Sequence, residues 1–372
     1  MITVFLLDNV LERLGRIPLR LKGGYLHECQ KGKMVFLITT TLACLFFVPA
    51  AKSYADSKII LGYYTGDSTI EFRQFHTYMN QISTDTLNTD SNGNIVGNVP
   101  KQAVSYANSV NVLPYALVSN YGAKGWDSNI AHQVLSNSKA KNTLIKNMLS
   151  LVKKNKYKGI NIDFEAVLPK DRTALTAFVK EVSKTMKANN LLTMVSVPAK
   201  STDDPSDDWT GAYDYEALEN AADYIQVMTY DEHGVWSDPG SVASAAPWIE
   251  SSLQFSIDYI PSEKVIMGIP EYGNDWNLSD PTNKSNSLVE WKNISELIAT
   301  TGATPVRDEV SGSMYFYYTD FDGCKHVVWY EDETSIKNKT HYTQTYELAG
   351  VLTYAIGMED QKFWEAISSG LK

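Results

Sequence analysis

Cysteine is scarce in this chain of 372 residues, which contains only Cys29, Cys44 and Cys324. Three cysteines are too few for a disulfide framework or for the usual four-ligand structural zinc site. Charged residues are also sparse, at 20%, whereas hydrophobic residues make up 44%. Disordered chains show the opposite balance, so the sequence indicates a globular protein.

Positive charge is in deficit, with 33 Lys and Arg residues against 43 Asp and Glu and a formal net charge of −10. An acidic chain is a poor match for the phosphate backbone, so we expect no nucleic-acid partner. No G-x-G-x-x-G motif follows the first predicted strand, which weakens the case for a dinucleotide site. The six histidines show no H-E-x-x-H or other metal-binding spacing, so we expect no metal site.

One uncharged hydrophobic run of 14 residues stands near the amino terminus, at 35–48 (VFLITTTLACLFFV). It is shorter than the ~20 residues that a membrane-spanning helix needs. Two lysines precede it, and the segment 53–55 (Ser-Tyr-Ala) follows with small residues at the two positions that a signal peptidase reads. Residues 1–55 are therefore predicted to be a leader with a secretory signal peptide that is cleaved after Ala55.

Other interpretations of this leader stay open. The run could be a signal-anchor that is not cleaved, and Met34 could be the true start. A lipid anchor on Cys44 fits less well, because Thr41 replaces the usual aliphatic residue of the lipobox. Cleavage would remove seven of the 33 basic and three of the 43 acidic residues, which leaves a net charge of −14 and one cysteine. An exported chain without a disulfide is more typical of a bacterium than of a eukaryotic secretory pathway.

Beyond the leader, short apolar runs alternate with amphipathic stretches. Residues 141–154 and 172–188 carry apolar side chains at helical spacing, and 248–259 is a further predicted helix. This alternation favours parallel strands with right-handed crossovers, and about eight strand candidates fit a closed (β/α)8 TIM barrel of the α/β class. A doubly wound open sheet is the alternative. The predicted strands include 59–64, 110–119, 159–164, 192–197, 224–230, 265–269 and 350–357.

The alternation breaks before the final strand. Residues 311–330 are rich in Tyr, Phe, Val and Trp, which is typical of antiparallel strands. We therefore predict a small α+β insertion over about residues 274–342, near the end of strand 7. No internal repeat or linker is evident, so residues 56–372 are predicted to form one catalytic barrel that contains this insertion.

The segment 157–167 reads YKGINIDFEAV. Successive side chains of a strand point to opposite faces, so the apolar residues at positions 160, 162 and 164 are predicted to face the helices. Asn161, Asp163 and Glu165 would then all face the barrel interior. Polar residues in a row on a core face are typical of functional sites, and these approach the carboxyl end of the strand, where barrel enzymes keep their active sites.

Two adjacent carboxylates cannot both ionise freely at close range, so the pKa of one of them tends to rise. A carboxyl group with a raised pKa can protonate a leaving-group oxygen. Glu165 is longer and nearer the rim, so we expect it to be the catalytic acid, with Asp163 as its orienting partner. The alternative for these acids is an ordinary buried ion pair or a solvated strand edge.

Several motifs resemble one enzyme family. The run Lys158–Glu165 resembles the D-x-x-D-x-D-x-E strand of glycoside hydrolase family 18, the chitinase-like family. Residues 227–233 (VMTYDEH) resemble its M-x-Y-D strand end. Residues 269–276 (IPEYGNDW) resemble the seventh-strand motif of a bacterial branch that contains spore cortex-lytic and sporulation glycosylases. The motifs occur in the family's order, and the resemblance covers nearly the whole chain after the leader.

The resemblance implies retaining hydrolysis in which the substrate assists. The acetamido oxygen of an N-acetylglucosamine unit would attack its own anomeric carbon to give an oxazolinium intermediate. Glu165 would protonate the glycosidic oxygen and later activate water, and Asp163 would hold the acetamido group. Tyr230 and Asp231 would bind that group from the opposite wall. No metal or organic cofactor is implied.

Two parts of the sequence depart from the family pattern. Lys158 and Asn161 stand where the strand motif has its first two aspartates. Asn161 removes a carboxyl group that could share a proton with Asp163, although its amide can still hydrogen-bond to an inward aspartate. Tyr354 stands where many relatives have the Trp that forms the sugar floor, and its smaller ring can still stack.

Other aromatic and amide side chains near strand ends are candidates for sugar contacts. One of Tyr63 and Tyr64 must face inward at the end of the first strand. The remaining tryptophans at positions 126, 209, 236 and 329 are expected to pack the fold rather than to form a platform. The predicted substrate-binding residues are Asn161, Tyr230, Asp231, Tyr354, Tyr64, Asn120, Tyr272 and Trp276.

These observations predict an exported glycosidase of the chitinase or β-N-acetylglucosaminidase type that acts on β-linked N-acetylglucosamine glycans. Peptidoglycan or spore cortex is preferred to chitin on the branch resemblance alone. We expect a monomer that is secreted or lies in the cell envelope or spore of a bacterium, with membrane contact only through an uncleaved leader. The alternatives are a silent, lectin-like sugar-binding barrel, which the retained Glu165 disfavours, and a structural role in the envelope or spore.

Overall fold

A computed structural model describes residues 58–372, except residues 67, 281 and 283. The predicted leader, residues 1–55, lies outside the described residues, and so do Cys29, Met34 and Cys44. Within the described part of the chain, no helix is both long enough and apolar enough to cross a membrane.

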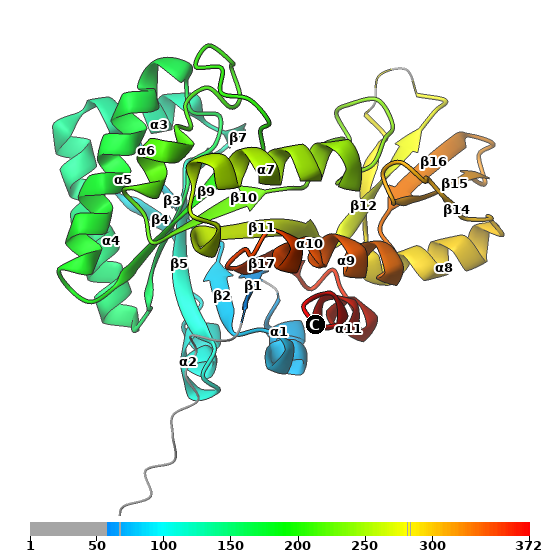
Figure 1. Cartoon of the computed structure of the whole chain (residues 1–372), viewed down its shortest axis with the longest axis horizontal. Coiled ribbons are helices and arrows are strands. Elements are labelled where there is room, and N and C mark those ends of the chain that lie inside the picture. Colours follow the sequence, from blue (N-terminus) through cyan, green and yellow to red (C-terminus); the bar gives the residue numbers. More distant parts are fainter. Residues whose placement is uncertain (1–57, 67, 281, 283) are drawn as a thin grey trace, which may run out of the picture. The chain divides into compact units, whose positions relative to one another are not determined.

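Eight parallel strands form a closed barrel (Figure 1). Each strand pairs with two neighbours in the ring, and the pairing of β2 with β5 closes it. The predicted (β/α)8 barrel is confirmed, and the open sheet is wrong. The barrel strands are β1 (Ile59–Tyr64), β2 (Gln81–Thr84), β5 (Leu113–Ser119), β8 (Gly159–Asp163), β9 (Leu192–Pro198), β10 (Tyr224–Met228), β11 (Val265–Pro270) and β17 (Gly350–Ile356).

Strand β2 was not among the strands that the sequence pattern predicted. Its sequence, QIST, has one apolar residue, Ile82, which packs in the core between barrel and helices. Ser83 instead points into the barrel, where its hydroxyl accepts a hydrogen bond from Asn161 at 3.1 Å. A strand with polar side chains on its inner face carries little hydrophobic periodicity.

Helices cover the outside of the barrel (Figure 1). Helix α4 (Ser138–Asn155) begins where the Asn137 side chain accepts hydrogen bonds from two backbone N–H groups, and it ends at Lys156 in the left-handed conformation. Helix α5 (Arg172–Lys187) buries its predicted apolar face, and its Phe178 stacks on Phe164 with 5.5 Å between the ring centroids. The other barrel helices are α1 (Thr69–Phe75), α2 (Lys101–Ser109), α3 (Ser128–Ser136), α6 (Tyr215–Glu219), α7 (Glu250–Tyr259), α9 (Glu333–Thr340), α10 (Tyr342–Thr345) and α11 (Gln361–Gly370).

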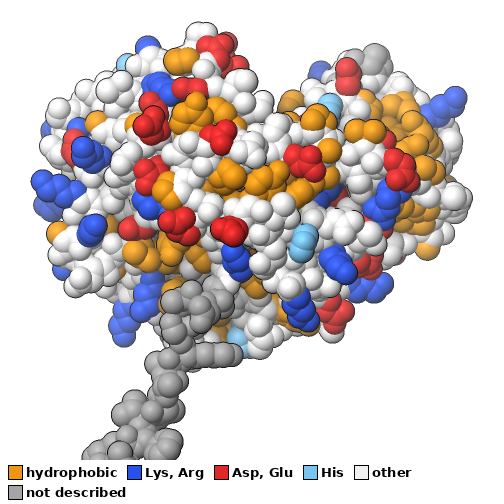
Figure 2. Space-filling view, in the orientation of Figure 1, with side chains coloured by type: hydrophobic (Ala, Val, Ile, Leu, Met, Phe, Trp, Pro, Cys, Tyr) orange, Lys and Arg blue, Asp and Glu red, His pale blue; other side chains and the backbone are white. Residues whose placement is uncertain are grey.

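A second sheet is inserted between β11 and β17. Its five strands are antiparallel, in the order β13-β12-β16-β15-β14, and α8 (Trp291–Thr301) packs Ile294 against one of its faces. In Figure 2, hydrophobic side chains gather on the lobe that this insertion forms. The strands are β12 (Tyr272–Asn277), β13 (Ser287–Glu290), β14 (Val306–Arg307), β15 (Met314–Thr319) and β16 (Lys325–Tyr330).

The sheet lies almost wholly within the predicted insertion of 274–342, but the chain returns to the barrel earlier, because α9 packs against α11. A buried ion pair joins the two parts. Lys339 on α9 lies 2.6 Å from Glu331, just after β16, and both side chains are 1% exposed. Ser313 bridges the two charges with hydrogen bonds of 2.6 and 2.9 Å.

Candidate active site

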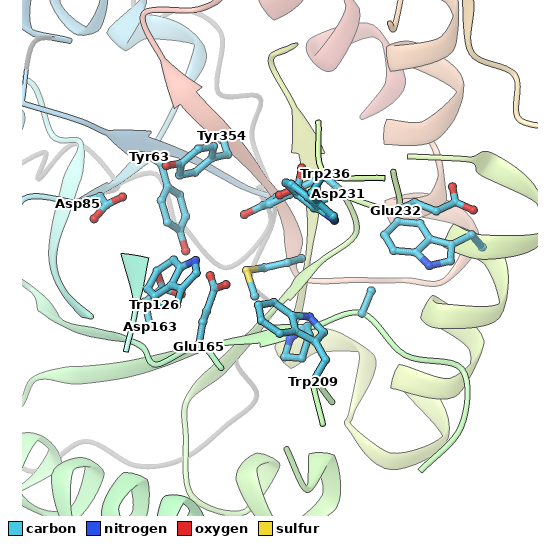
Figure 3. Close-up of a pocket in the computed structure, with 15 residues that line it drawn as sticks. Tyr63, Asp85, Trp126, Asp163, Glu165, Trp209, Asp231, Glu232, Trp236 and Tyr354 are labelled. Carbon is cyan, nitrogen blue, oxygen red and sulfur yellow. The ribbon is translucent and has the colours of Figure 1, made fainter. Parts of the chain in front are cut away.

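A cavity of about 680 Å³ opens at the carboxyl ends of the barrel strands (Figure 3). Five carboxylates and a ring of aromatic side chains line it, and no Lys, Arg or His is among the described residues that line it. The predicted residues Asp163, Glu165, Tyr230, Asp231 and Tyr354 all line this cavity. The remaining lining residues are Tyr63, Asp85, Trp126, Pro198, Ala199, Trp209, Met228, Glu232, Trp236 and Trp248.

Strand β8 directs its polar side chains inward, as the two-residue period predicts. Asn161 lies below the cavity in a buried network, where its amide donates to Tyr63 Oη and to Ser83 Oγ, each at 3.1 Å. It does not line the cavity, so the predicted direct sugar contact is replaced by support of Tyr63 from below. Asp163 ends the strand at the cavity wall, and its Oδ1 is buried without a hydrogen-bond partner among the described residues.

Glu165 follows β8 by two residues and is held through its backbone. Its N–H donates to Asn120 Oδ1 at 2.8 Å, and its carbonyl accepts from Asn120 Nδ2 at 2.7 Å. Asn120 itself is fully buried and lies outside the cavity. The residue that was predicted to contact sugar from the rim therefore positions Glu165 instead.

The carboxylates of the cavity raise one another's pKa. Burial raises the pKa of Glu165 well above its ordinary value, and the negative charges of Asp163, Asp231 and Asp85 raise it further. Burial also raises the pKa of Asp163, and the charge of Asp85 adds to this effect. A glutamate with a raised pKa can act as a general acid, which is the role that the sequence predicts for Glu165.

The opposite wall follows β10, where Asp231 turns the chain with a positive φ of 65°. The buried Tyr272 donates a hydrogen bond from its hydroxyl to Asp231 Oδ1. Burial raises the pKa of Asp231, and this hydrogen bond offsets part of the rise. Tyr272 does not line the cavity. It was predicted to contact sugar, and it instead orients Asp231 through this hydrogen bond.

Three tyrosines form one side of the cavity. The Tyr354 ring stacks on the Tyr230 ring, with 6.0 Å between the ring centroids. It also makes an edge-on contact with the Tyr63 ring, with 5.5 Å between the centroids. Tyr64 does not reach the cavity, because its side chain packs among the helices and its hydroxyl pairs with Thr69 at 2.6 Å. The structure thus places Tyr63, and not the predicted Tyr64, at the substrate side.

The exposed tryptophans reverse the expectation from sequence. Trp126, Trp209 and Trp236 are 37%, 47% and 67% exposed and line the cavity, although they were expected to pack the fold. Trp276 was the predicted sugar contact, but it is 1% exposed and donates from Nε1 to the Ser237 carbonyl at 2.9 Å. It thereby anchors the loop that carries Trp236.

No group of three or more His, Cys, Asp or Glu side chains is placed to hold a metal ion within the described residues.

Comparison with known proteins assigns the family. Residues 122–359 match Glycosyl hydrolases family 18. The chain belongs to glycosyl hydrolase family 18. In this family-18 protein the segment that carries Asp163 and Glu165 lies inside the matched region and ends at the cavity. The protein is therefore a glycosidase, and its substrate is a carbohydrate.

Relatives agree with this assignment over most of the family-18 chain. A Bacillus subtilis protein described as an uncharacterized glycosylase is 43% identical over 91% of this chain and 99% of its own length. A chitinase from Chromobacterium violaceum is 34% identical, with a TM-score of 0.80 over 85% of this chain and 99% of that one. The spore cortex-lytic enzyme of Bacillus cereus has the same TM-score at 20% identity, over 85% and 74% of the chains, and so shows the fold alone.

Proposed function

We propose that this glycosidase cleaves β-linked N-acetylglucosamine glycans with the substrate's own acetamido group as nucleophile. The observation that carries the proposal is Asp163 Oδ1, which is buried at the cavity wall without a hydrogen-bond partner among the described residues. Leaving such an acceptor unpaired costs about 1–3 kcal/mol. An acetamido N–H is the donor that would pair it, and that bond would aim the acetamido oxygen at the anomeric carbon.

The first chemical step needs one proton donor and one nucleophile. Glu165, protonated because burial and neighbouring charges raise its pKa, gives its proton to the glycosidic oxygen. The bond from this oxygen to the anomeric carbon breaks as the acetamido oxygen bonds to the same carbon. The oxazolinium ion that results is positive, and ionised Asp163 stabilises it. Tyr230 and Asp231 hold the acetamido group from the opposite wall.

The second step reverses the proton transfer. Glu165 is now ionised and takes a proton from a water molecule that attacks the anomeric carbon. The bond from the acetamido oxygen to that carbon breaks, so the acetamido group is restored. Two inversions at one carbon give a product with retained configuration.

We propose peptidoglycan or spore cortex as the natural glycan, with chitin as the second candidate. A cortical fragment-lytic enzyme of Bacillus anthracis is 27% identical over 69% of this chain and 60% of its own length, which supports the first. The match to a bacterial chitinase supports the second. Because the chain without its leader carries a net charge of −14, adhesion to anionic wall polymers is disfavoured. Exposed tryptophans would hold the sugars by stacking.

We also propose that the protein is exported and acts as a monomer in the cell envelope or spore. The support is the sequence of residues 31–55, with its lysines, apolar run and cleavage segment. Export would bring the cavity to a glycan that lies outside the cytoplasm.

The test is hydrolysis by the purified protein of peptidoglycan, spore-cortex fragments and chitooligosaccharides, beside Glu165→Gln. We expect release of reducing ends, with a rate about 10²–10⁴-fold lower in the variant and binding retained. Equal rates would contradict the role of Glu165. NMR of the first product should show the β-anomer, and the α-anomer would contradict retention. Substrate without N-acetyl groups should resist cleavage.

A further inference from the structure

On the inner face of the barrel, Asp85 and Asp163 stand at the ends of β2 and β8, the two strands that flank β5. One layer below them, Asn161 and Ser83 touch, with 3.1 Å between Nδ2 and Oγ. Strands β2 and β8 run in the same direction, since both pair in parallel with β5. The next inward position lies two residues further on in each case: Asp163 ends β8, and Asp85 is the first residue after β2. Both line the cavity, and Figure 3 shows their carboxylates around Tyr63 with that of Glu165.

Within the part of the chain that the structure describes, no cation neutralises either carboxylate. No Lys, Arg or His lines the cavity, and no ion pair to either aspartate occurs among the described residues. The Asp85 side chain accepts no hydrogen bond within the same part of the chain, where its one contact of this kind is its backbone N–H to the Tyr64 carbonyl at 2.8 Å. Two such groups in a shared, partly dehydrated space cannot both ionise without a large cost.

The pKa shifts of the two aspartates agree with this arrangement. Burial raises the pKa of Asp85 to about 6. The charge of Asp85 is the second cause, after burial, that raises the pKa of Asp163. The charge of Asp85 also acts on other titratable groups of the cavity, since it raises the pKa of Tyr63, Glu165 and Tyr354.

We propose that Asp85 is a positioning residue of the reaction, which forms with Asp163 a pair that holds one proton between them. The proposal rests on the proposed function. When an acetamido N–H occupies Asp163, the proton is favoured on Asp85, and Asp163 faces the oxazolinium ion as a carboxylate. Asn161, the inward neighbour on the same strand, is an amide and cannot take this proton. Strand β2 therefore supplies the titratable partner that β8 lacks.

The pH profile of kcat/KM tests this role with Asp85→Asn, Asp85→Glu and a control, Glu309→Gln. Glu309 is exposed and lies outside the cavity. Without the second charge Asp163 ionises at lower pH, so Asp85→Asn should shift the acid limb downward by about one pH unit. Asp85→Glu and the control should keep the wild-type limb. An acid limb that stays in place in Asp85→Asn would overturn the proposal.

A second readout needs no substrate. A carboxyl group with a raised pKa in the folded state makes stability fall as pH rises from the unfolded value near 4 to the folded value. The melting temperature of the wild type should therefore fall between pH 4 and 7, and that of Asp85→Asn should fall less. An equal fall of the melting temperature in the wild type and in Asp85→Asn would overturn the proposed pairing of Asp85 with Asp163. Wild-type protein that cleaves no glycan would instead contradict the proposed function, and the melting comparison would still decide on the pair.

Discussion

Asn120 and Glu165 exchange two hydrogen bonds, one on each side of the Glu165 residue. The Glu165 N–H donates to Asn120 Oδ1 at 2.8 Å, and Asn120 Nδ2 donates to the Glu165 carbonyl at 2.7 Å. A single side chain just after β5 thus fixes the backbone of the proposed catalytic acid, while the Glu165 carboxyl group lines the cavity. Most of the control over Glu165 therefore lies outside the surface that a sugar could touch.

Replacement of the Asn120 side chain should affect the chemical step more than substrate binding. We expect Asn120→Ala to lower kcat by about 10–100-fold, because a shift of about 1 Å in a catalytic group can cost 10²-fold in rate. KM should change by less than about threefold, since Asn120 does not line the cavity. Steady-state kinetics on a soluble oligosaccharide measure both constants. Asn108→Ala, on helix α2, is the matched control, and a rise in KM with unchanged kcat in Asn120→Ala would refute a positioning role.

The hydrogen bond from Tyr272 to Asp231 predicts a change in pH dependence. This bond lowers the pKa of Asp231 against the effect of burial. Tyr272→Phe removes it, so Asp231 should stay protonated to higher pH and the acid limb of kcat/KM should move upward. A hydrogen bond to a charged group contributes about 1.5–3 kcal/mol, so kcat/KM at pH 5 should fall at least tenfold. A profile that only drops in height, with its limbs in place, would argue against titration of Asp231.

The exposed tryptophans predict a dependence on substrate length. Trp209→Ala and Trp236→Ala should each raise KM for long oligosaccharides by about 5–100-fold, because the apolar face of a sugar loses burial against the ring, at roughly 25 cal/mol per Å². The KM for the shortest cleaved substrate should change less. Tyr317→Ala is the control, because Tyr317 is 63% exposed on the insertion and does not line the cavity. An equal effect of the control would show that general surface changes, and not stacking, set KM.

The ion pair between Lys339 and Glu331 predicts a stability effect. Lys339→Met leaves the Glu331 charge buried without its partner, so the free energy of unfolding should fall by about 3–5 kcal/mol. The double variant Lys339→Met/Glu331→Leu should recover most of this loss, because two apolar side chains avoid the cost of burying charge. Urea unfolding followed by circular dichroism measures both. A double variant that is less stable than Lys339→Met would contradict this explanation.

The sequence predicted those parts of the site in which the two-residue alternation along a single strand sets the direction of each side chain. Residues 160–165 alternate between apolar and polar side chains, and this alternation alone gives the inward direction of Asn161 and Asp163. Tyr63 and Tyr64 could not be separated in this way. The pairing of β1 with β17 shifts register between Gly62 and Tyr64, so the facing of these tyrosines depends on a neighbour that is distant in sequence.

The other residues of the site could not be predicted, because they lie in loops or next to strands without hydrophobic periodicity. Trp209 and Trp236 lie in loops without a repeating pattern, so sequence gave no signal for their direction beyond their place shortly after strands β9 and β10. Asp85 follows a strand with a single apolar residue and is brought to Asp163 only by barrel closure. Trp276 lies on β12 and points under a loop whose course the insertion determines.

The last barrel strand to be synthesised, β17, pairs with both β1 and β11 and carries Tyr354. A ribosome must therefore release almost the entire chain before the ring can close and the tyrosine wall can form. A chain that lacks β17 cannot close the ring, and its cavity lacks Tyr354. The connectivity of the barrel thus delays a complete cavity until synthesis of the chain is nearly finished.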